Sequence, residues 1–209
     1  KTFELPADLN IIRLFHPIYD QYGTPVEENR AKQELELDSS KRYLLFFGFI
    51  RSYKGLDILI EAFGRTNLPG DVDLLIAGEF YEDRERYLKL IQDSGVSSRI
   101  HLKEGYIPSD RVKFFFCAAK AVVLPYRSAT QSGITQIAIH FSLPVISTRV
   151  GGIEEYIRHD YNGWLTSSDS AVLASDLSRL FKEDPFERYA EAQSEVLQKY
   201  SWKAFVEEL

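Results

Sequence analysis

Two cations, Arg51 and Lys54, stand three positions apart in the stretch GFIRSYKG (48–55), between Gly48 and Gly55. Cations at this spacing bind phosphate oxygens, and a helix that begins beside them adds the partial positive charge of its N-terminus. The stretch therefore predicts an anion-binding turn in which Arg51 and Lys54 act on phosphate. A solvated basic turn without a ligand is the alternative.

A second polar turn, PYRSATQSGITQIA (125–138), contains no carboxylate and no lysine, although 27% of the chain is charged. Backbone N–H groups at the start of the helix that follows would hold a phosphate, and no acid is present to repel it. A cluster of helix-capping side chains is the alternative, since Ser and Thr also cap helices. The candidate binding residues of this turn are Arg127, Thr130, Gln131, Ser132 and Gly133.

The elements that would position these turns are short apolar runs separated by segments with helical periodicity. This alternation is typical of βαβ units and predicts an α/β fold with a doubly wound parallel sheet. Strands are expected at 43–49, 72–78, 99–105, 121–126, 144–149 and 163–166. Crossover helices are expected at 55–66, 83–95, 109–120, 133–142 and 152–160, followed by a helix at 170–184 that Asp169 can cap.

In an open parallel sheet, ligands bind at the carboxyl ends of the strands, where loops and helix N-termini converge. The basic turn and the polar turn each follow an expected strand, so both should lie at this edge. Gly78 follows another strand and leaves space there, and Glu79 beside it is either exposed or faces the ligand. The sequence therefore predicts a single site at one edge of the sheet.

Composition restricts the class of protein. The 209 residues are 44% hydrophobic, which suits one sizeable domain with a full core. A net charge of -6 argues against a nucleic-acid-binding surface. The single cysteine, Cys117, excludes a disulfide framework, and the four histidines have no metal-ligand spacing, so no metal is expected. Without a membrane-spanning stretch or a signal-peptide pattern, the chain is expected to be cytoplasmic.

Two regions differ in character. Residues 1–42 are interrupted by Pro and Gly and are interpreted as a connecting arm with a short helix, and residues 43–209 as the Rossmann-like domain. The chain begins at Lys1 without a methionine and ends inside the amphipathic segment SWKAFVEEL, so a fragment of a longer protein is expected.

Five segments in order, LLFFGFIRSYKGLDILIEAF, VDLLIAGE, RIHLKEGYIPSDRVKFFFCAAKAVVLPY, LPVISTRVGGIEEYI and NGWLTSSDSAVLASDLSRLF, carry a resemblance to a known family. Residues 43–205 resemble the C-terminal, donor-binding domain of the retaining GT-B glycosyltransferases, the group 1 family that includes bacterial polysaccharide transferases. The resemblance implies that this domain holds a nucleotide-diphospho-sugar, such as a UDP- or GDP-sugar, and that an N-terminal twin domain binds a saccharide or lipid-linked acceptor across a cleft.

The resemblance also implies roles for single residues. Lys54 would contact the diphosphate, and Arg51 would replace the arginine that family members carry where Phe49 stands here. Gly48 follows the first strand at the same turn, and backbone groups of Tyr106 and Ile107 would meet the base. Two glutamates usual in the family are missing: Thr130 stands at the first position, and the second falls among residues 136–138, where Gln136 is assigned to the ribose.

The chemistry that the resemblance implies is cleavage of a sugar–phosphate bond through an oxocarbenium-like state, in which cations and helix amides stabilise the leaving diphosphate without a metal. Two alternatives remain: a nucleotide-sugar 2-epimerase of the same fold, and a domain of this descent that only binds nucleotides or partners. A flavodoxin-type or receiver-type domain is disfavoured, since no acidic cluster follows the first strand.

Further expectations follow if the chain is only the donor-binding half. It should bind the donor without turning it over. The segment with Phe15, Tyr19 and Tyr22 and the final segment SWKAFVEEL would pack against the twin domain, and exposed without it they would favour dimerisation. A lipid-linked acceptor would add peripheral association with the inner membrane face.

Overall fold

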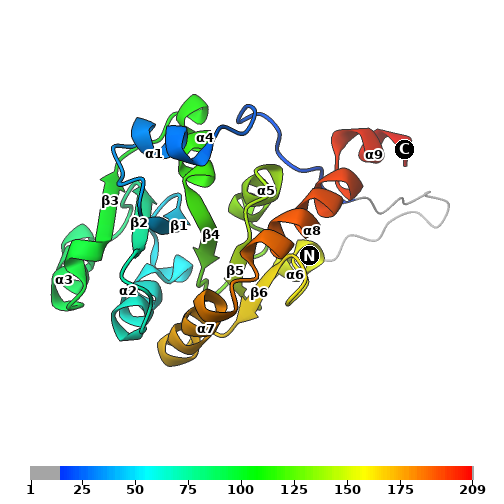
Figure 1. Cartoon of the computed structure of the whole chain (residues 1–209). Coiled ribbons are helices and arrows are strands. Elements are labelled where there is room, and N and C mark those ends of the chain that lie inside the picture. The colour runs from blue at the N-terminus through cyan, green and yellow to red at the C-terminus, as the bar shows by residue number, and fades with distance from the viewer. Residues whose placement is uncertain (1–14, 209) are drawn as a thin grey trace.

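Six parallel strands form one sheet in the order β3-β2-β1-β4-β5-β6, seen at the centre of the computed structural model in Figure 1. The structure describes residues 15–208. The strands are β1 (Arg42–Phe47), β2 (Val72–Gly78), β3 (Ile100–Glu104), β4 (Ala119–Leu124), β5 (Val145–Thr148) and β6 (Gly163–Thr166). This confirms the predicted doubly wound parallel sheet.

The strands are apolar on both faces because helices cover both faces of the sheet. In β1, Tyr43, Leu45 and Phe47 belong to one hydrophobic cluster, whereas Leu44 and Phe46 belong to a second one. Successive side chains of a strand point to opposite faces, so the alternation places one cluster on each side. Parallel strands that are buried on both faces need apolar residues at nearly every position, and the sequence has this pattern.

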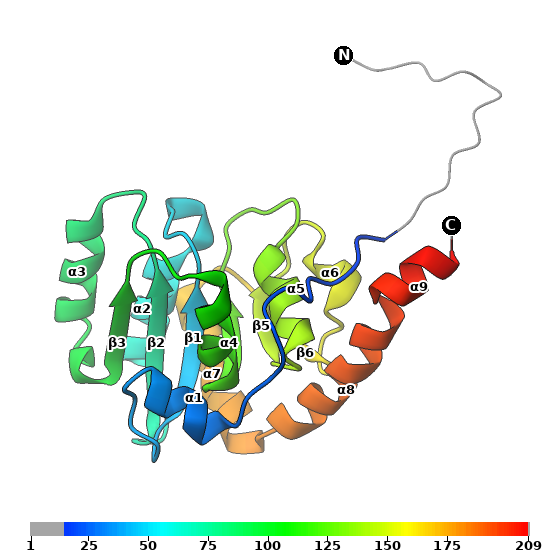
Figure 2. The same cartoon turned by 90° about the horizontal axis from the view of Figure 1, so that it is seen from above.

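Helices form one layer on each face of the sheet (Figure 2). The cluster of Leu45 receives side chains from α1 (Glu28–Glu34), α4 (Ser109–Cys117) and α5 (Gly133–His140). The cluster of Leu44 receives them from α2 (Leu56–Arg65), α3 (Arg84–Asp93) and α7 (Ser170–Glu183). The remaining elements are α6 (Ile153–Tyr156), α8 (Phe186–Lys199), α9 (Trp202–Glu207) and the 3-10 turns η1 (Ser52–Lys54) and η2 (Ser97–Arg99).

Two helices, α4 and α6, end three or more residues earlier than the periodicity predicts. The helix α4 ends at Cys117 rather than at 120, because Ala119 already pairs with Tyr43 of β1 and requires an extended backbone. The helix α6 ends at Tyr156 rather than at 160. There the Asn162 amide donates to the Tyr156 carbonyl at 2.8 Å and replaces a helical hydrogen bond. The predicted cap of α7 is confirmed, since Asp169 accepts from the backbone of Ala171 and Val172.

The segment before β1 lies along the Leu45 face of the sheet and reaches the C-terminal helices. It contains the expected short helix, α1, and its apolar stretch begins at residues outside the described part. Phe15 packs edge-on against Tyr200, with ring centroids 5.1 Å apart, and against Phe205 at 5.9 Å. The backbone of Ile18 donates to the Tyr200 carbonyl at 2.9 Å. The two terminal segments thus contact each other, while Trp202 remains about half exposed.

The order of the strands decides where a ligand can enter. Strands β2 and β3 follow one another on one side of β1, and the chain then crosses back so that β4 lies on the other side of β1. At such a reversal the loops after the two central strands leave in opposite directions and open a crevice. Here these are the loop from β1 to α2 and the loop from β4 to α5. They contain the basic turn and the polar turn.

Candidate functional site

The side chain of Lys54 is the chemical centre of this crevice. It leaves the short turn η1, which ends at Gly55 in the left-handed conformation with a φ of 68°. Lys54 is only 8% exposed. Within residues 15–208 no carboxylate forms an ion pair with its amine, and burial, with a smaller effect of Arg51, lowers the pKa of that amine from 10.5 to about 8. The amine lies over the ring of Tyr126, 5.9 Å from its centroid, but a buried cation without an anionic partner is costly, so an anionic ligand is the natural complement.

Two glycines leave the space in which this amine lies. A Cβ atom built at Gly48 would stand 3.0 Å from the Lys54 Nζ. A Cβ atom at Gly78 would stand 2.0 Å from the Gly48 carbonyl oxygen, so only a glycine permits the close approach of these two loops. Both residues have a positive φ, 102° at Gly48 and 144° at Gly78. Side chains at either position would fill the crevice or separate its walls.

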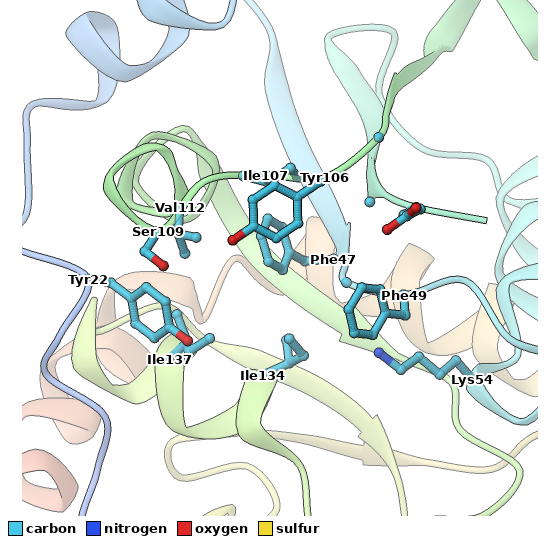
Figure 3. A pocket seen from close by; sticks show the side chains of 14 residues that line it. Tyr22, Phe47, Phe49, Lys54, Tyr106, Ile107, Ser109, Val112, Ile134 and Ile137 are labelled. Atoms are coloured by element: carbon cyan, nitrogen blue, oxygen red, sulfur yellow. The ribbon is translucent and has the colours of Figure 1, made fainter. Parts of the chain in front are cut away.

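One cavity, of about 270 Å³, opens beside Lys54 and has mainly apolar walls (Figure 3). We call it the apolar cavity. Figure 3 shows Tyr106, Phe49 and the Lys54 amine around it. Among the residues predicted for the site, it is lined by Gly48, Lys54, Glu79, Tyr106 and Ile107.

A second cavity, of about 520 Å³, lies on the other side of Lys54, and we call it the polar cavity. It is lined by the predicted residues Thr130, Gln131, Ser132 and Gly133 at the start of α5, and it shares Lys54 and Ile134 with the apolar cavity. The Ser132 hydroxyl caps this helix by accepting from the Thr135 backbone N–H at 3.2 Å. The capping interpretation of this turn therefore holds for Ser132, and the same turn forms a wall of the polar cavity.

Arg51 does not line either cavity. Its guanidinium lies over the ring of Tyr81, 4.9 Å from the centroid, and the neighbouring Ser52 backbone N–H donates to Glu82 at 2.7 Å. Phe49, which occupies the place of the family's arginine, lines the apolar cavity and packs on Tyr81 with ring centroids 4.7 Å apart. The phosphate role of Arg51 stays a prediction.

Arg127 also lies outside both cavities. Its two terminal nitrogens donate to the two carboxylate oxygens of Asp57, each at 2.8 Å, and one of them also donates to the Ser52 carbonyl at 2.7 Å. Gln136 is 2% exposed inside α5, and its side-chain oxygen has no hydrogen-bond partner in the described part of the chain. The roles of Arg127 and Gln136 toward a ligand remain predictions.

Several lining residues were not predicted from the sequence. Tyr22 reaches the apolar cavity from the segment before α1, and Ser109 reaches it from the first turn of α4 (Figure 3). Tyr53 and Tyr126 line the polar cavity. Tyr126 is buried, which raises the pKa of its phenol, although the Ser132 hydroxyl opposes this effect. The one available signal was position, since Ser109 follows the carboxyl end of a strand by a few residues.

Residues 15–208 contain neither a metal-binding cluster nor a helix of membrane-spanning character. No group of three His, Cys, Asp or Glu side chains in residues 15–208 is arranged to hold a metal ion. In the same part of the chain, no helix has the length and hydrophobicity to cross a membrane.

A doubly wound sheet with paired cavities at its switch point defines a Rossmann-like α/β class of protein. The chain belongs to the family of group 1 glycosyl transferases, whose model matches residues 27–199. It is 26% identical over 186 residues to an uncharacterized glycosyltransferase of Methanocaldococcus jannaschii, covering 87% of this chain and 47% of that protein. This confirms the family resemblance.

Solved structures share the fold. The sucrose-phosphate synthase of Thermosynechococcus elongatus matches with a TM-score of 0.77 at 20% identity, over 92% of this chain and 49% of the other. HepE of Anabaena, solved in complex with UDP, matches with a TM-score of 0.76 at 20% identity, over 91% of this chain and 55% of the other. The Rossmann-like fold thus matches GT-B glycosyltransferases. The chain spans about half the length of the relatives that it matches.

Proposed function

We propose that this domain binds the nucleotide-diphospho-sugar donor of a retaining glycosyltransferase, which transfers the sugar from UDP or GDP to a saccharide or lipid-linked acceptor. The single observation that carries the proposal is the Lys54 amine, buried between two cavities without a carboxylate partner in the described residues. The family membership supplies the donor class, and HepE is a protein of the same fold solved with UDP.

The two cavities match the two ends of such a donor. The apolar cavity offers Tyr106 and Ile107 to a flat base. The diphosphate would lie between the Lys54 amine and the first N–H groups of α5, which carry a partial positive charge. The transferred sugar would then occupy the polar cavity, where Thr130 and Gln131 offer hydroxyl and amide groups to its diols.

Lys54 would act on the leaving group. When the bond between the sugar C1 and the diphosphate oxygen breaks, both electrons of that bond stay on the oxygen, and the negative charge there increases. A cation held in a partly dry site stabilises this charge more than a solvated one. The acceptor oxygen would bond to C1 from the same face as its proton passes to the departing diphosphate oxygen, and this gives retention of configuration.

Some parts of the proposal lie outside these cavities. Because the chain spans about half the length of its relatives, we assign acceptor binding to the remaining half of the protein. We further propose a cytoplasmic location, since nucleotide sugars are charged substrates.

A direct test is titration calorimetry of the chain with UDP, GDP, ADP and their common sugar conjugates. We expect selective binding, and Lys54→Ala should weaken it roughly tenfold or more because a charge-assisted phosphate contact is lost. Lys182→Ala, which removes an exposed lysine from the distant helix α7, is the matched control and should bind as the wild type does. Equal affinity of the Lys54→Ala variant and the wild type would contradict the proposal.

One observation favours a second candidate, a domain that binds nucleotides without catalysis. Among the described residues, no carboxylate lines the polar cavity. The two candidates differ in turnover by the full-length protein. Release of UDP or GDP from the cognate nucleotide sugar, dependent on acceptor and lost in Lys54→Ala, would support the transferase. Tight binding without any turnover would support the second candidate.

A further inference from the structure

Arg127 and Asp57 form an ion pair beneath the basic turn. The Asp57 side chain lies in the first turn of α2 and is only 14% exposed. Burial alone would raise the pKa of this carboxyl, but the hydrogen bonds and charge of Arg127 more than compensate and lower it. A second cation, Arg86, donates to the same carboxylate at 2.9 Å. Asp57 is thus held as an anion.

Arg127 also donates hydrogen bonds to the turn that carries Lys54. Its backbone N–H donates to the Tyr53 carbonyl at 2.7 Å, and its guanidinium donates to the Ser52 carbonyl at 2.7 Å. The turn also touches this loop at Gly55, where an added Cβ atom would stand 2.0 Å from the Pro125 carbonyl oxygen. Arg127 therefore fastens two residues of η1 and the start of α2 to the loop after β4.

Such a fastening is needed because the contact that the Lys54 amine makes with the ring of Tyr126, 5.9 Å from its centroid, is a weak restraint. A lysine that is 8% exposed and has no anionic partner in the described residues would gain solvation by swinging outward. The backbone of η1 must therefore be held firmly enough to oppose this movement. A guanidinium that donates to both oxygens of a carboxylate supplies a strong and directional restraint.

We infer that Arg127 and Asp57 are positioning residues, which hold the turn Ser52–Lys54 so that the Lys54 amine lies between the two cavities. The inference rests on the proposed function, in which that amine meets the donor diphosphate. Arg127 acts through Lys54 rather than on the ligand, since both terminal nitrogens of its guanidinium are engaged and it lines neither cavity.

The first test needs no ligand. The lysines are reductively methylated with 13C-formaldehyde, the Lys54 resonance is assigned by its loss in Lys54→Arg, and its pKa is followed by NMR. We expect a pKa near 8 in the wild type, and in Arg127→Ala and Asp57→Asn a rise toward 10.5, as the amine gains solvent. Arg86→Ala, which removes the other partner of Asp57 but no contact to η1, should leave it unchanged. An unchanged pKa in folded Arg127→Ala would overturn the inference.

The second test uses UDP and GDP as probes. Arg127→Ala should weaken the binding of the preferred nucleotide roughly tenfold when it is introduced into the wild type. In a protein that already carries Lys54→Ala, it should weaken that binding by less than about twofold. Arg127→Lys keeps the charge but not the paired geometry, so its affinity for the nucleotide should lie between those of the wild type and Arg127→Ala. Equal losses in both backgrounds would overturn the inference. If no nucleotide binds the wild type, the proposed function fails, whereas a variant-dependent pKa of Lys54 would still support the positioning role.

Discussion

The Lys54 ammonium nitrogen lies 3.0 Å from the position that a Cβ atom would take at Gly48, so the smallest possible side chain there would press on the amine. The contact joins the residue after β1 to the last residue of η1, on the two sides of the basic turn. The Lys54 ammonium can therefore lie where it does only because residue 48 has no side chain.

Replacement of this glycine should therefore damage both folding and binding. Gly48→Ala must adopt a φ of 102° and also displace Lys54 or Ile134. We expect a loss of about 1–2 kcal/mol in the free energy of unfolding, together with weaker nucleotide binding. Gly95→Ala is the control, since it has a φ of 75° but open space around the added Cβ atom. Denaturant unfolding and calorimetry of both variants would show whether Gly95→Ala destabilises the fold without changing affinity. Equal affinities for Gly48→Ala and the wild type would contradict the prediction.

Nucleotide affinity should depend on pH through Lys54. Because burial lowers its pKa to about 8, the amine is charged below that pH and becomes neutral above it in the free protein. Binding of a diphosphate requires the charged form, so affinity should fall as the pH rises through 8, by up to about tenfold per pH unit. Titrations at a series of pH values would test this. The Lys54→Ala variant should have a flatter profile, and a profile that does not change on this substitution would assign the titration to another group.

The same burial predicts that Lys54 weakens the fold. Its pKa is lowered from 10.5 to about 8, so the folded state disfavours the charged amine by a free energy on the order of 3 kcal/mol below pH 8. This cost disappears as the pH rises toward 10.5, where the unfolded chain also loses the proton. Lys54→Met should therefore be more stable than the wild type at pH 7, by about 1–3 kcal/mol, and the difference should vanish near pH 10.5. Urea unfolding of the variant and the wild type at both pH values would test this prediction. A variant less stable than the wild type at pH 7 would contradict it.

Arg51 should matter less than Lys54. Arg51 is exposed, and its guanidinium is held over Tyr81 outside both cavities, so its attraction for a phosphate is screened by solvent and salt. We expect Arg51→Ala to weaken nucleotide binding by less than about threefold, and the effect to shrink as salt is added. Parallel titrations of the Arg51→Ala and Lys54→Ala variants at low and high salt would measure this. Losses of the same size would show that Arg51 leaves Tyr81 to contact the diphosphate, as the family resemblance implies.

The sequence by itself determined the sheet and the edge at which the site lies. Continuous apolar runs must be buried on both faces, and the helical segments between them must cover those faces, so the parallel doubly wound arrangement follows from periodicity. The position of Lys54 at the same edge as the start of α5 also follows, because strands of such a sheet end at one common edge. These are local properties of the chain, and they need no knowledge of which residues meet.

Only the tertiary structure decided which charged side chains pair with each other and which one is left at the cavities. Arg127 and Asp57 are 70 positions apart, and no spacing rule joins them, yet they meet because β1 and β4 are neighbours in the sheet. That pairing leaves Lys54 as the buried cation of the basic turn and draws Arg127 away from both cavities. The burial of Gln136 and the arrival of Tyr22 at the apolar cavity depend in the same way on packing between distant segments. Burial and partner choice are properties of the assembled fold, and so is the chemistry that depends on them.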